Sequence, residues 1–307
     1  SILGDKDESA KVIFKDDGMV DILVGTQSNG QGHETVFAQF LSDQTGIPAD
    51  HIRVVQGDSD LIARGGGTGG SRSGTVQANA TLQTVAVMQK AFRAFLSDKL
   101  DVDADQIVFD DERFRAPGSN LSPTFLEVAD MARAAGREDL MQHSAYAVLD
   151  SRSFPNGAHI CEVEIDPDTG AVEVARYSVV DDFGNLLNPM LVEGQVHGGV
   201  AQGIGQAISE HVVYDDQGQL LSASFMDYAV PRAKDVPFYQ FETEPLPTTT
   251  NVMGMKGCGE AGTVGALAAV SNAVHDALSC CGVRQLDMPF TPLRVWEALN
   301  QADVAAE

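Results

Sequence analysis

Cysteine is scarce in this sequence, with four residues among 307, and none of the four shows C-x-x-C spacing. Cysteine pairs at that spacing are typical ligands of zinc knuckles and iron–sulfur clusters. We therefore expect neither kind of site in this chain. The cysteine usage suits a reducing compartment, and a cytoplasmic location is predicted.

Basic residues and long apolar runs are also few. Lys and Arg total 20 against 44 Asp and Glu, which gives a formal net charge of −24. A chain this acidic is not expected to bind nucleic acid or an anionic membrane. No apolar run approaches the ~20 residues that a membrane span needs, and the first ten residues show no pattern of a secretory signal. A soluble globular protein is predicted.

Two common catalytic patterns are missing as well. The seven histidines show no pairing at metal-ligand spacing, so structural roles are predicted for most of them. No G-x-S-x-G nucleophile elbow occurs, which argues against a serine hydrolase.

Glycine, in contrast, is abundant and is concentrated in four stretches: residues 27–35, 64–74, 193–207 and 251–265. Such density favours positive φ angles or close approach of the backbone to a ligand. Helix starts predicted beside these stretches would direct N–H groups at an anion. Taken singly, each stretch also fits a surface turn, a linker or tight helix packing. Together they suit a large, flat, phosphate-bearing cofactor.

Hydrophobic periodicity predicts an α+β fold with two lobes of mixed β-sheets flanked by helices, residues 1–140 and 141–307. Residues 135–144 are interpreted as a connector. The expected strands lie within 11–26, 52–56, 106–114, 158–165, 171–180, 211–222 and 238–243, and the expected helices are 36–46, 76–96, 122–135, 190–210 and 263–278.

The stretch 251–265 contains five glycines and a single acid, Glu260. A lone carboxylate delivered by such a loop is a candidate general base or acid. The same stretch satisfies G-x-G-x-x-G, the dinucleotide fingerprint, which requires a buried strand directly before it. Residues Pro245–Met253 are rich in Pro and Thr and do not predict that strand. A nucleotide-dependent dehydrogenase is therefore the less favoured alternative.

Four ordered motifs resemble the C-terminal part of the molybdopterin-binding large subunit of the molybdenum hydroxylases, the family of xanthine dehydrogenase, aldehyde oxidoreductase and carbon monoxide dehydrogenase. The motifs are G-Q-G-H-E-T at 30–35, G-T-G-G-S-R-S at 67–73, E-G-Q-V-H-G-G-V-A-Q-G-I-G-Q-A at 193–207 and K-G-C-G-E at 256–260. The resemblance runs from about Ser9 to Trp296.

This resemblance implies a set of site residues. Glu260 would be the catalytic glutamate, which accepts a proton from a molybdenum-bound hydroxide. Gln31 would lie beside the molybdenum oxo group, while the metal is held through the pterin and not directly by the protein. The residues implied to bind the cofactor are Gly30, Gln31, Gly32, His33, Gly70, Ser71, Arg72, Ser73, Gly74, Gln202, Lys256 and Gly257.

The resemblance also implies a reaction and partners. The expected activity is oxidative hydroxylation of an aldehyde or an N-heterocycle with water as the oxygen source. The expected cofactor is molybdopterin with molybdenum, in the cytosine dinucleotide form, and iron–sulfur clusters and FAD are expected only on partner chains. Family large subunits are longer, so the N-terminal half of the molybdenum subunit is an expected partner, as a separate chain or a missing part. The isolated chain is expected to be inactive.

A second hypothesis stays open beside the first. The chain could be a cofactor-free module that completes a site only with its partner subunits. Molybdenum content separates this module from the catalytic portion, whereas NAD(P) binding would support the dehydrogenase.

Overall fold

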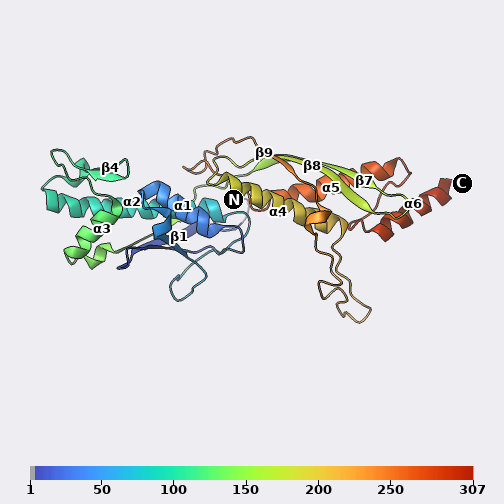
Figure 1. Cartoon of the computed structure of the whole chain (residues 1–307), viewed down its shortest axis with the longest axis horizontal. Helices are drawn as coiled ribbons and strands as arrows, with labels where there is room; N and C mark the ends of the chain where they lie inside the picture. Colours follow the sequence, from blue (N-terminus) through green and yellow to red (C-terminus); the bar gives the residue numbers. More distant parts are fainter. Residues whose placement is uncertain (1–3, 307) are drawn as a thin grey trace. The chain divides into compact units, whose positions relative to one another are not determined.

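The protein was analysed as a computed structural model that describes residues 4–306. The chain forms two compact units (Figure 1). The first unit comprises the chain up to Phe154 together with Asn185–Asn188 and Pro247–Gly257. The second comprises Pro155–Gly184, Pro189–Leu246 and the chain from Cys258 onward. The prediction of an α+β fold with mixed sheets flanked by helices is confirmed.

A mixed four-stranded sheet is the centre of the first unit, in the order β3-β2-β1-β6. Strand β1 pairs antiparallel with both β2 and β6, and β2 pairs parallel with β3. Three helices and the hairpin β4-β5 complete this unit. The elements are β1 (Asp7–Phe14), β2 (Val20–Val24), α1 (His33–Thr45), β3 (Ile52–Val55), α2 (Ser73–Leu100), β4 (Val108–Asp110), β5 (Arg113–Arg115), α3 (Phe125–Ala134) and β6 (Gln142–Val148).

The alternation of β1 explains how the core of this unit forms. Every second residue of the strand, from Glu8 to Phe14, is buried, because side chains alternate between the two faces of a sheet. Helix α2 lies on this face, where Thr84 Oγ1 donates to the carbonyl oxygen of Ala10 at 3.1 Å. Aromatic rings including Phe92, Phe114 and Phe125 fill the rest of the core. The buried face of β1 thus begins with a carboxylate.

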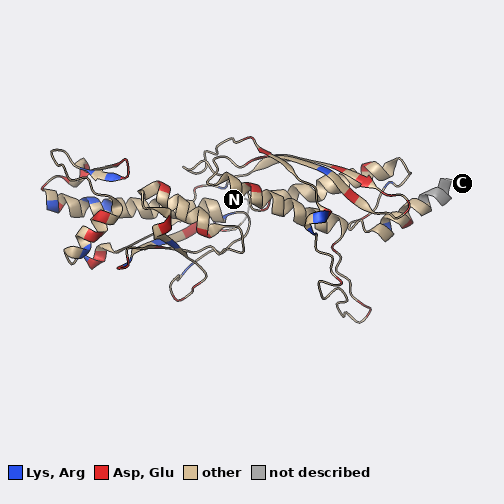
Figure 2. Cartoon of the chain, viewed as in Figure 1, with Lys and Arg blue, Asp and Glu red and all other residues tan. Residues whose placement is uncertain are grey.

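The second unit is built on a three-stranded mixed sheet, in the order β7-β8-β9, with β7 antiparallel and β9 parallel to β8. Helices α4 and α5 pack on each other, and α5 lies on β7. Each of these two helices has one acidic residue and no Lys or Arg, as Figure 2 shows. The elements are β7 (Asn156–Ile165), β8 (Val172–Asp182), α4 (Pro189–Ile208), β9 (Gln240–Thr243), α5 (Ala261–Ser279) and α6 (Pro292–Ala306).

The close packing of α4 on α5 requires glycine, which has no side chain, at two positions. A Cβ added at Gly262 of α5 would overlap the carbonyl oxygen of Val196, and one at Gly199 would lie 2.8 Å from the backbone nitrogen of Thr263. The glycines of residues 193–207 therefore allow two helix backbones to approach closely. Helix packing, one of the two interpretations of this stretch, accounts for these positions.

Three predicted elements differ from the structure. Residues 135–144 were interpreted as a connector, but residues 142–148 form strand β6 of the first unit, because this strand is defined by pairing with β1 far away in sequence. Helix α3 begins after Thr124, whose side chain and that of Glu127 form a capping box, and not at Ser122-Pro123. The hairpin predicted over 211–222 is reduced to one bridge, Tyr214 with Leu220.

Helix α6 was not predicted. The predicted division into two lobes stays a prediction. Residues 1–140 were expected to form the first cofactor-binding lobe, and residues 141–307 the lobe that carries the catalytic glutamate loop.

Candidate functional site

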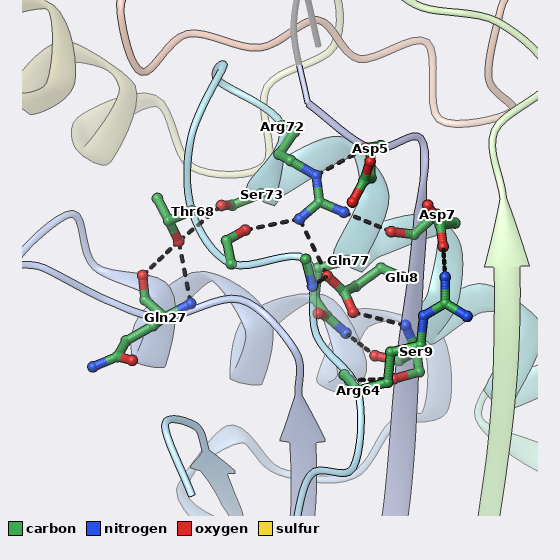
Figure 3. A network of polar contacts seen from close by, with 12 residues as sticks. Asp5, Asp7, Glu8, Ser9, Gln27, Arg64, Thr68, Arg72, Ser73 and Gln77 are labelled. Atoms are coloured by element: carbon green, nitrogen blue, oxygen red, sulfur yellow. Dashed lines mark hydrogen bonds and ion pairs between the residues drawn. The ribbon is translucent and has the colours of Figure 1, made fainter. Parts of the chain in front are cut away.

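The glycine-rich loop 64–74 is organised around a buried arginine, Arg72, at the start of α2 (Figure 3). Its guanidinium donates to a carboxylate oxygen of Glu8 at 3.2 Å and to the carbonyl oxygens of Asp5 and Gly67 at 2.8 and 2.7 Å. It also donates to the carbonyl oxygen of Asp7 at 2.5 Å. The five-donor fork of arginine suits such a set of acceptors. The Arg72 side chain therefore holds the loop in shape.

Glu8 completes this buried ion pair. Its carboxylate accepts from the backbone N–H of Gly66 at 3.0 Å and from that of Ser9 at 3.0 Å. A buried charge is tolerated when a partner and hydrogen bonds satisfy it. The first strand of the protein thereby fixes a loop that lies some 60 residues further along the chain.

Thr68 ties this loop to the first glycine-rich stretch, residues 27–35. Its hydroxyl donates to the carbonyl oxygen of Gln27 at 2.6 Å and accepts from the backbone N–H of the same residue at 3.1 Å. Ser73 Oγ lies 3.2 Å from the same hydroxyl (Figure 3). The structure thus brings two of the four predicted cofactor loops side by side. Thr68 was not among the predicted site residues, although it is the one residue with a side chain within 65–70.

The predicted residues 30–33 form the turn that starts α1. Gly32 is the N-cap with a φ of 79°, and Gly30 has a φ of 107°. The Gln31 side chain folds back over this turn, where Nε2 donates to the carbonyl oxygen of Gln27 at 3.1 Å and Oε1 accepts from the backbone N–H of Asn29. His33 is buried, and burial lowers the pKa of its imidazole, which therefore stays neutral at pH 7.

The segment 251–257 touches the start of α2. A Cβ added at Gly257 would overlap the carbonyl oxygen of Ser71, so the two backbones are in direct contact. The Asn251 side chain holds the segment by exchanging two hydrogen bonds with the backbone of Met255, at 2.9 and 3.1 Å. Lys256, which was predicted beside Gly257, is partly exposed. The first unit thus brings together the predicted residues of three motifs.

Gln202 and Glu260 belong to the second unit, where Thr263 connects their helices. Glu260 is exposed and is the N-cap of α5. Thr263, in the first turn of α5, has its Oγ1 3.1 Å from the carbonyl oxygen of Gly199 and 3.0 Å from Oε1 of Gln202. A single hydroxyl thus fixes α4 against the helix start that carries the predicted catalytic carboxylate. Thr263 was missed because nothing in its local sequence shows which helix it faces.

Cys258 precedes Glu260 by two residues and was interpreted as a packing residue. Burial raises the pKa of its thiol to about 11, so the sulfur is protonated at pH 7. Such a thiol is a poor metal ligand. Within residues 4–306, whose side chains are described up to residue 301, no three or more described His, Cys, Asp and Glu side chains form a group able to hold a metal ion. None of the helices in that range is both long enough and apolar enough to cross a membrane.

The loops of the first unit fit an anionic, planar cofactor. A Cβ at Gly30, Gly67 or Gly69 would meet no atom within 4 Å, so open space lies beside these backbones. Gly70 and Ser71 both have positive φ, 62° and 54°, and they lead into the N-terminus of α2. The change of hand from Ser71, with positive φ, to Arg72, in the right-handed α region, is the kind of alternation that directs successive N–H groups into a concavity that suits an anion. Arg72 contributes to this site through the shape of the loop, while its guanidinium binds protein groups.

The structure gives no support to the dinucleotide fingerprint. In the described part of the chain, β9 ends at Thr243, and no strand runs directly into residues 257–262. The βαβ unit that this fingerprint requires is therefore not formed.

Comparison with known proteins also indicates a cofactor-binding domain. The sequence matches the family described as the molybdopterin cofactor-binding domain over residues 2–237. The large chain of carbon monoxide dehydrogenase from Afipia carboxidovorans is 34% identical over 300 residues, which cover 96% of this chain and 37% of that protein. The nicotine 6-hydroxylase large subunit of Paenarthrobacter nicotinovorans is 35% identical, with coverage of 95% and 36%.

Solved structures show the same relationship. Cu,Mo-CO dehydrogenase in the carbon monoxide reduced state matches with a TM-score of 0.87 and 33% identity, over 97% of this chain and 38% of that one. Quinoline 2-oxidoreductase from Pseudomonas putida 86 matches with a TM-score of 0.85 and 32% identity, over 96% and 38%. This chain therefore spans little more than a third of the length of the relatives it matches.

Proposed function

This chain belongs to the molybdopterin cofactor-binding domain family of the molybdenum hydroxylases, and we propose that it is the cofactor-binding catalytic portion of such an enzyme. The proposed reaction is oxidative hydroxylation of an aldehyde or an N-heterocycle with water as the oxygen source. One observation carries the proposal: the motif loops 27–35, 64–74 and 251–257 meet in one unit, through Thr68 and through the contact of Gly257 with Ser71.

The proposed contacts to the cofactor are mainly backbone and amide groups. The N–H groups of residues 70–74 would bind the pterin and its diphosphate, because the change of hand from Ser71 to Arg72 and the α2 N-terminus favour an anion there. Gln31, whose amide is already held by Gln27, would lie beside the metal. Gln202 would hydrogen-bond the pterin. The bound group supplies a redox-active metal that oxidises the substrate carbon.

Glu260 is the proposed general base. Its position as the N-cap of α5, with Thr263 attached to α4, gives the carboxylate a fixed backbone from which to accept a proton. In the first unit, Lys256 and Gly257 would line the wall of the cofactor site. In this assignment no side chain of the chain ligates the metal.

Further assignments follow from the family. The cytosine dinucleotide form is proposed for the cofactor, and iron–sulfur and FAD subunits are proposed as partners that remove electrons. The rest of the molybdenum subunit is a further proposed partner, since this chain spans little more than a third of its relatives. A cytoplasmic location and inactivity of the isolated chain are proposed as well.

Metal analysis tests the function. The chain is purified alone and again after co-expression with the rest of the large subunit and the iron–sulfur and FAD subunits. We expect about one molybdenum per chain only in the second preparation. Molybdenum in neither preparation would favour a module that binds partners but no cofactor, and the role of Glu260 would then be dropped.

Glu260→Gln in the complete enzyme separates catalysis from binding. The variant should retain its molybdenum and lose turnover by about 10²–10⁴-fold, which is the range for removal of a general base. Glu193→Gln, an exposed acid on α4, is the matched control and should keep its activity. Full turnover in Glu260→Gln would refute the assignment of this residue.

A further inference from the structure

The segment between α4 and β9 contributes no residue to the hydrophobic core. Throughout residues 209–238, here named the arm, no residue is buried. Figure 1 shows this part of the chain as an extended loop that runs away from the end of α4. A segment of this length in a globular unit normally places some apolar side chains in the core, so the arm requires an explanation.

The arm is rich in apolar side chains although it is exposed. Among the residues whose side chains the structure describes, 24 large hydrophobic residues are exposed, and eight of them lie in these 30 residues, which is a third of them in about a tenth of the chain. Phe225, Met226 and Phe238 are 85%, 93% and 101% exposed. The stretch 211–230 has three acids and no Lys or Arg, so few charges separate these side chains (Figure 2). Apolar groups gathered in this way mark an interaction surface.

The arm is nevertheless ordered by its own polar groups. Asp215 closes a turn by accepting from the backbone N–H groups of Gln217 and Gln219 at 2.9 and 2.8 Å. The Ser224 hydroxyl donates to Asp227 at 2.7 Å, within a second turn. The backbone is thus fixed while the apolar side chains remain outside, an arrangement that lowers the entropic cost of binding.

The base of the arm is attached to the end of α4. Tyr228 Oη donates to the Glu210 carboxylate at 2.6 Å, and Ser209 Oγ donates to the carbonyl oxygen of Ala229 at 3.0 Å. Phe225 and Met226 lie just before this attachment, so the arm presents them from a held position.

The comparisons indicate which partner this surface would meet. The molybdopterin cofactor-binding domain match extends over residues 2–237, and the CO dehydrogenase structure covers 97% of this chain. The arm is therefore a feature shared with that enzyme and not an addition. The matched part is only 38% of the CO dehydrogenase chain, so there the counterpart of the arm belongs to a polypeptide more than twice as long.

We propose that the arm is a docking element for the rest of the molybdenum subunit, the polypeptide that corresponds to the part of the relatives' large chains outside the match. Phe225, Met226 and Phe238 are its apolar anchors. This inference rests on the proposed function, because that function supplies the identity of the partner. A second copy of this chain and the iron–sulfur or FAD subunit are the alternative occupants.

Site-specific photocrosslinking in the assembled enzyme tests the occupant. Benzoylphenylalanine is placed at position 225 and, as a control, at Leu61, which is 56% exposed in the first unit. Position 225 should crosslink to the rest of the molybdenum subunit, in the same polypeptide or in a co-expressed one, several-fold more than position 61. Crosslinks to a second copy of this chain, to another subunit or to nothing would each overturn the proposal.

A substitution tests the energetic role. Phe225→Asp combined with Met226→Asp should lower the yield of the assembled subunit at least tenfold, whereas Leu61→Asp should not. The melting temperature of the chain purified alone should be unchanged, because the arm contributes nothing to the core. Normal assembly of the double variant would sink the proposal. Assembly is measured without reference to molybdenum, so failure of docking and failure of the proposed function are distinguishable.

Discussion

The backbone of Gly257 lies against the carbonyl oxygen of Ser71, so closely that a side chain at position 257 would overlap it. Ser71 precedes α2, and Gly257 ends the segment that leads to Glu260. This contact joins two of the motifs by which the family is recognised, although 185 intervening residues separate them in the chain.

Gly257→Ala should destabilise the chain by about 1–3 kcal/mol, the usual cost of overpacking, because the atom it meets is backbone and cannot rotate away. Urea unfolding measures the change. Gly69→Ala is the matched control, since a Cβ there meets nothing within 4 Å and its φ is not positive. Equal stability of the two variants would contradict the contact.

Arg72→Lys should destabilise the first unit by about 3–5 kcal/mol, because Glu8 would remain buried and the carbonyl groups of the loop would lose their donors. Lysine presents a point charge and cannot reproduce the planar fork. Thermal unfolding gives the measurement, and Arg64→Lys, at an exposed ion pair with Asp7, should change little. A melting temperature unaltered by Arg72→Lys would show that the network is dispensable.

Thr263→Val should weaken the attachment of α4 to the start of α5. The hydroxyl contacts to Gly199 and Gln202 are lost, at a cost of about 1–2 kcal/mol. Thr263→Ser retains the hydroxyl and should behave like the native protein. If Gln202 and Glu260 act together, the complete enzyme with Thr263→Val should also lose activity, and the serine variant should restore it. Equal rates for both variants would leave Thr263 without a positioning role.

Alkaline pH should destabilise the fold through two partly buried thiols, those of Cys161 and Cys258. Burial raises the pKa of Cys161 and Cys258 from 9.0 to about 11. Above pH 9 the unfolded chain releases these protons while the folded chain keeps them. The stabilisation from these protonated thiols is therefore complete below pH 9. Between pH 9 and 11 the free energy of unfolding falls by up to about 1.4 kcal/mol per thiol and pH unit. Urea titrations at pH 8 and 10 test this, and Cys161→Ala with Cys258→Ala should flatten the slope.

The exposed Cys280 and Cys281 provide the control for these thiols. With iodoacetamide at pH 8, the folded chain should be alkylated at 280 and 281 well before 161 and 258, as mass spectrometry of peptides would show. Rapid alkylation of Cys258 would contradict its burial.

Mild acid should destabilise the fold through buried imidazoles. Burial lowers the pKa of His33 and of His143 below 6.5, so below that pH the unfolded chain takes up protons first. The stabilisation is complete above pH 6.5 and is lost as the pH falls through the lowered values. Unfolding at pH 7.5 and 5.5 should show a smaller difference in His143→Gln than in the native chain.

The periodic elements could be predicted from the sequence because their signals are local. Helices α1, α2, α4 and α5 and the hairpin β7-β8 lie where apolar spacing and turn residues predict them. The motifs likewise predicted the family. Strand β6 could not be recognised, because pairing with β1, some 130 residues earlier, is what makes it a strand.

By itself, the sequence determined where the backbone is free to turn, which residues face a core and which family the motifs belong to, since these depend on neighbouring residues. Only the tertiary structure decided that Thr68 reaches Gln27, that Gly257 meets Ser71 and that the Arg72 side chain supports its loop from a buried position. The physical reason is distance along the chain. These contacts join residues 41 to 186 positions apart, so no local pattern specifies them and packing of the whole unit selects them.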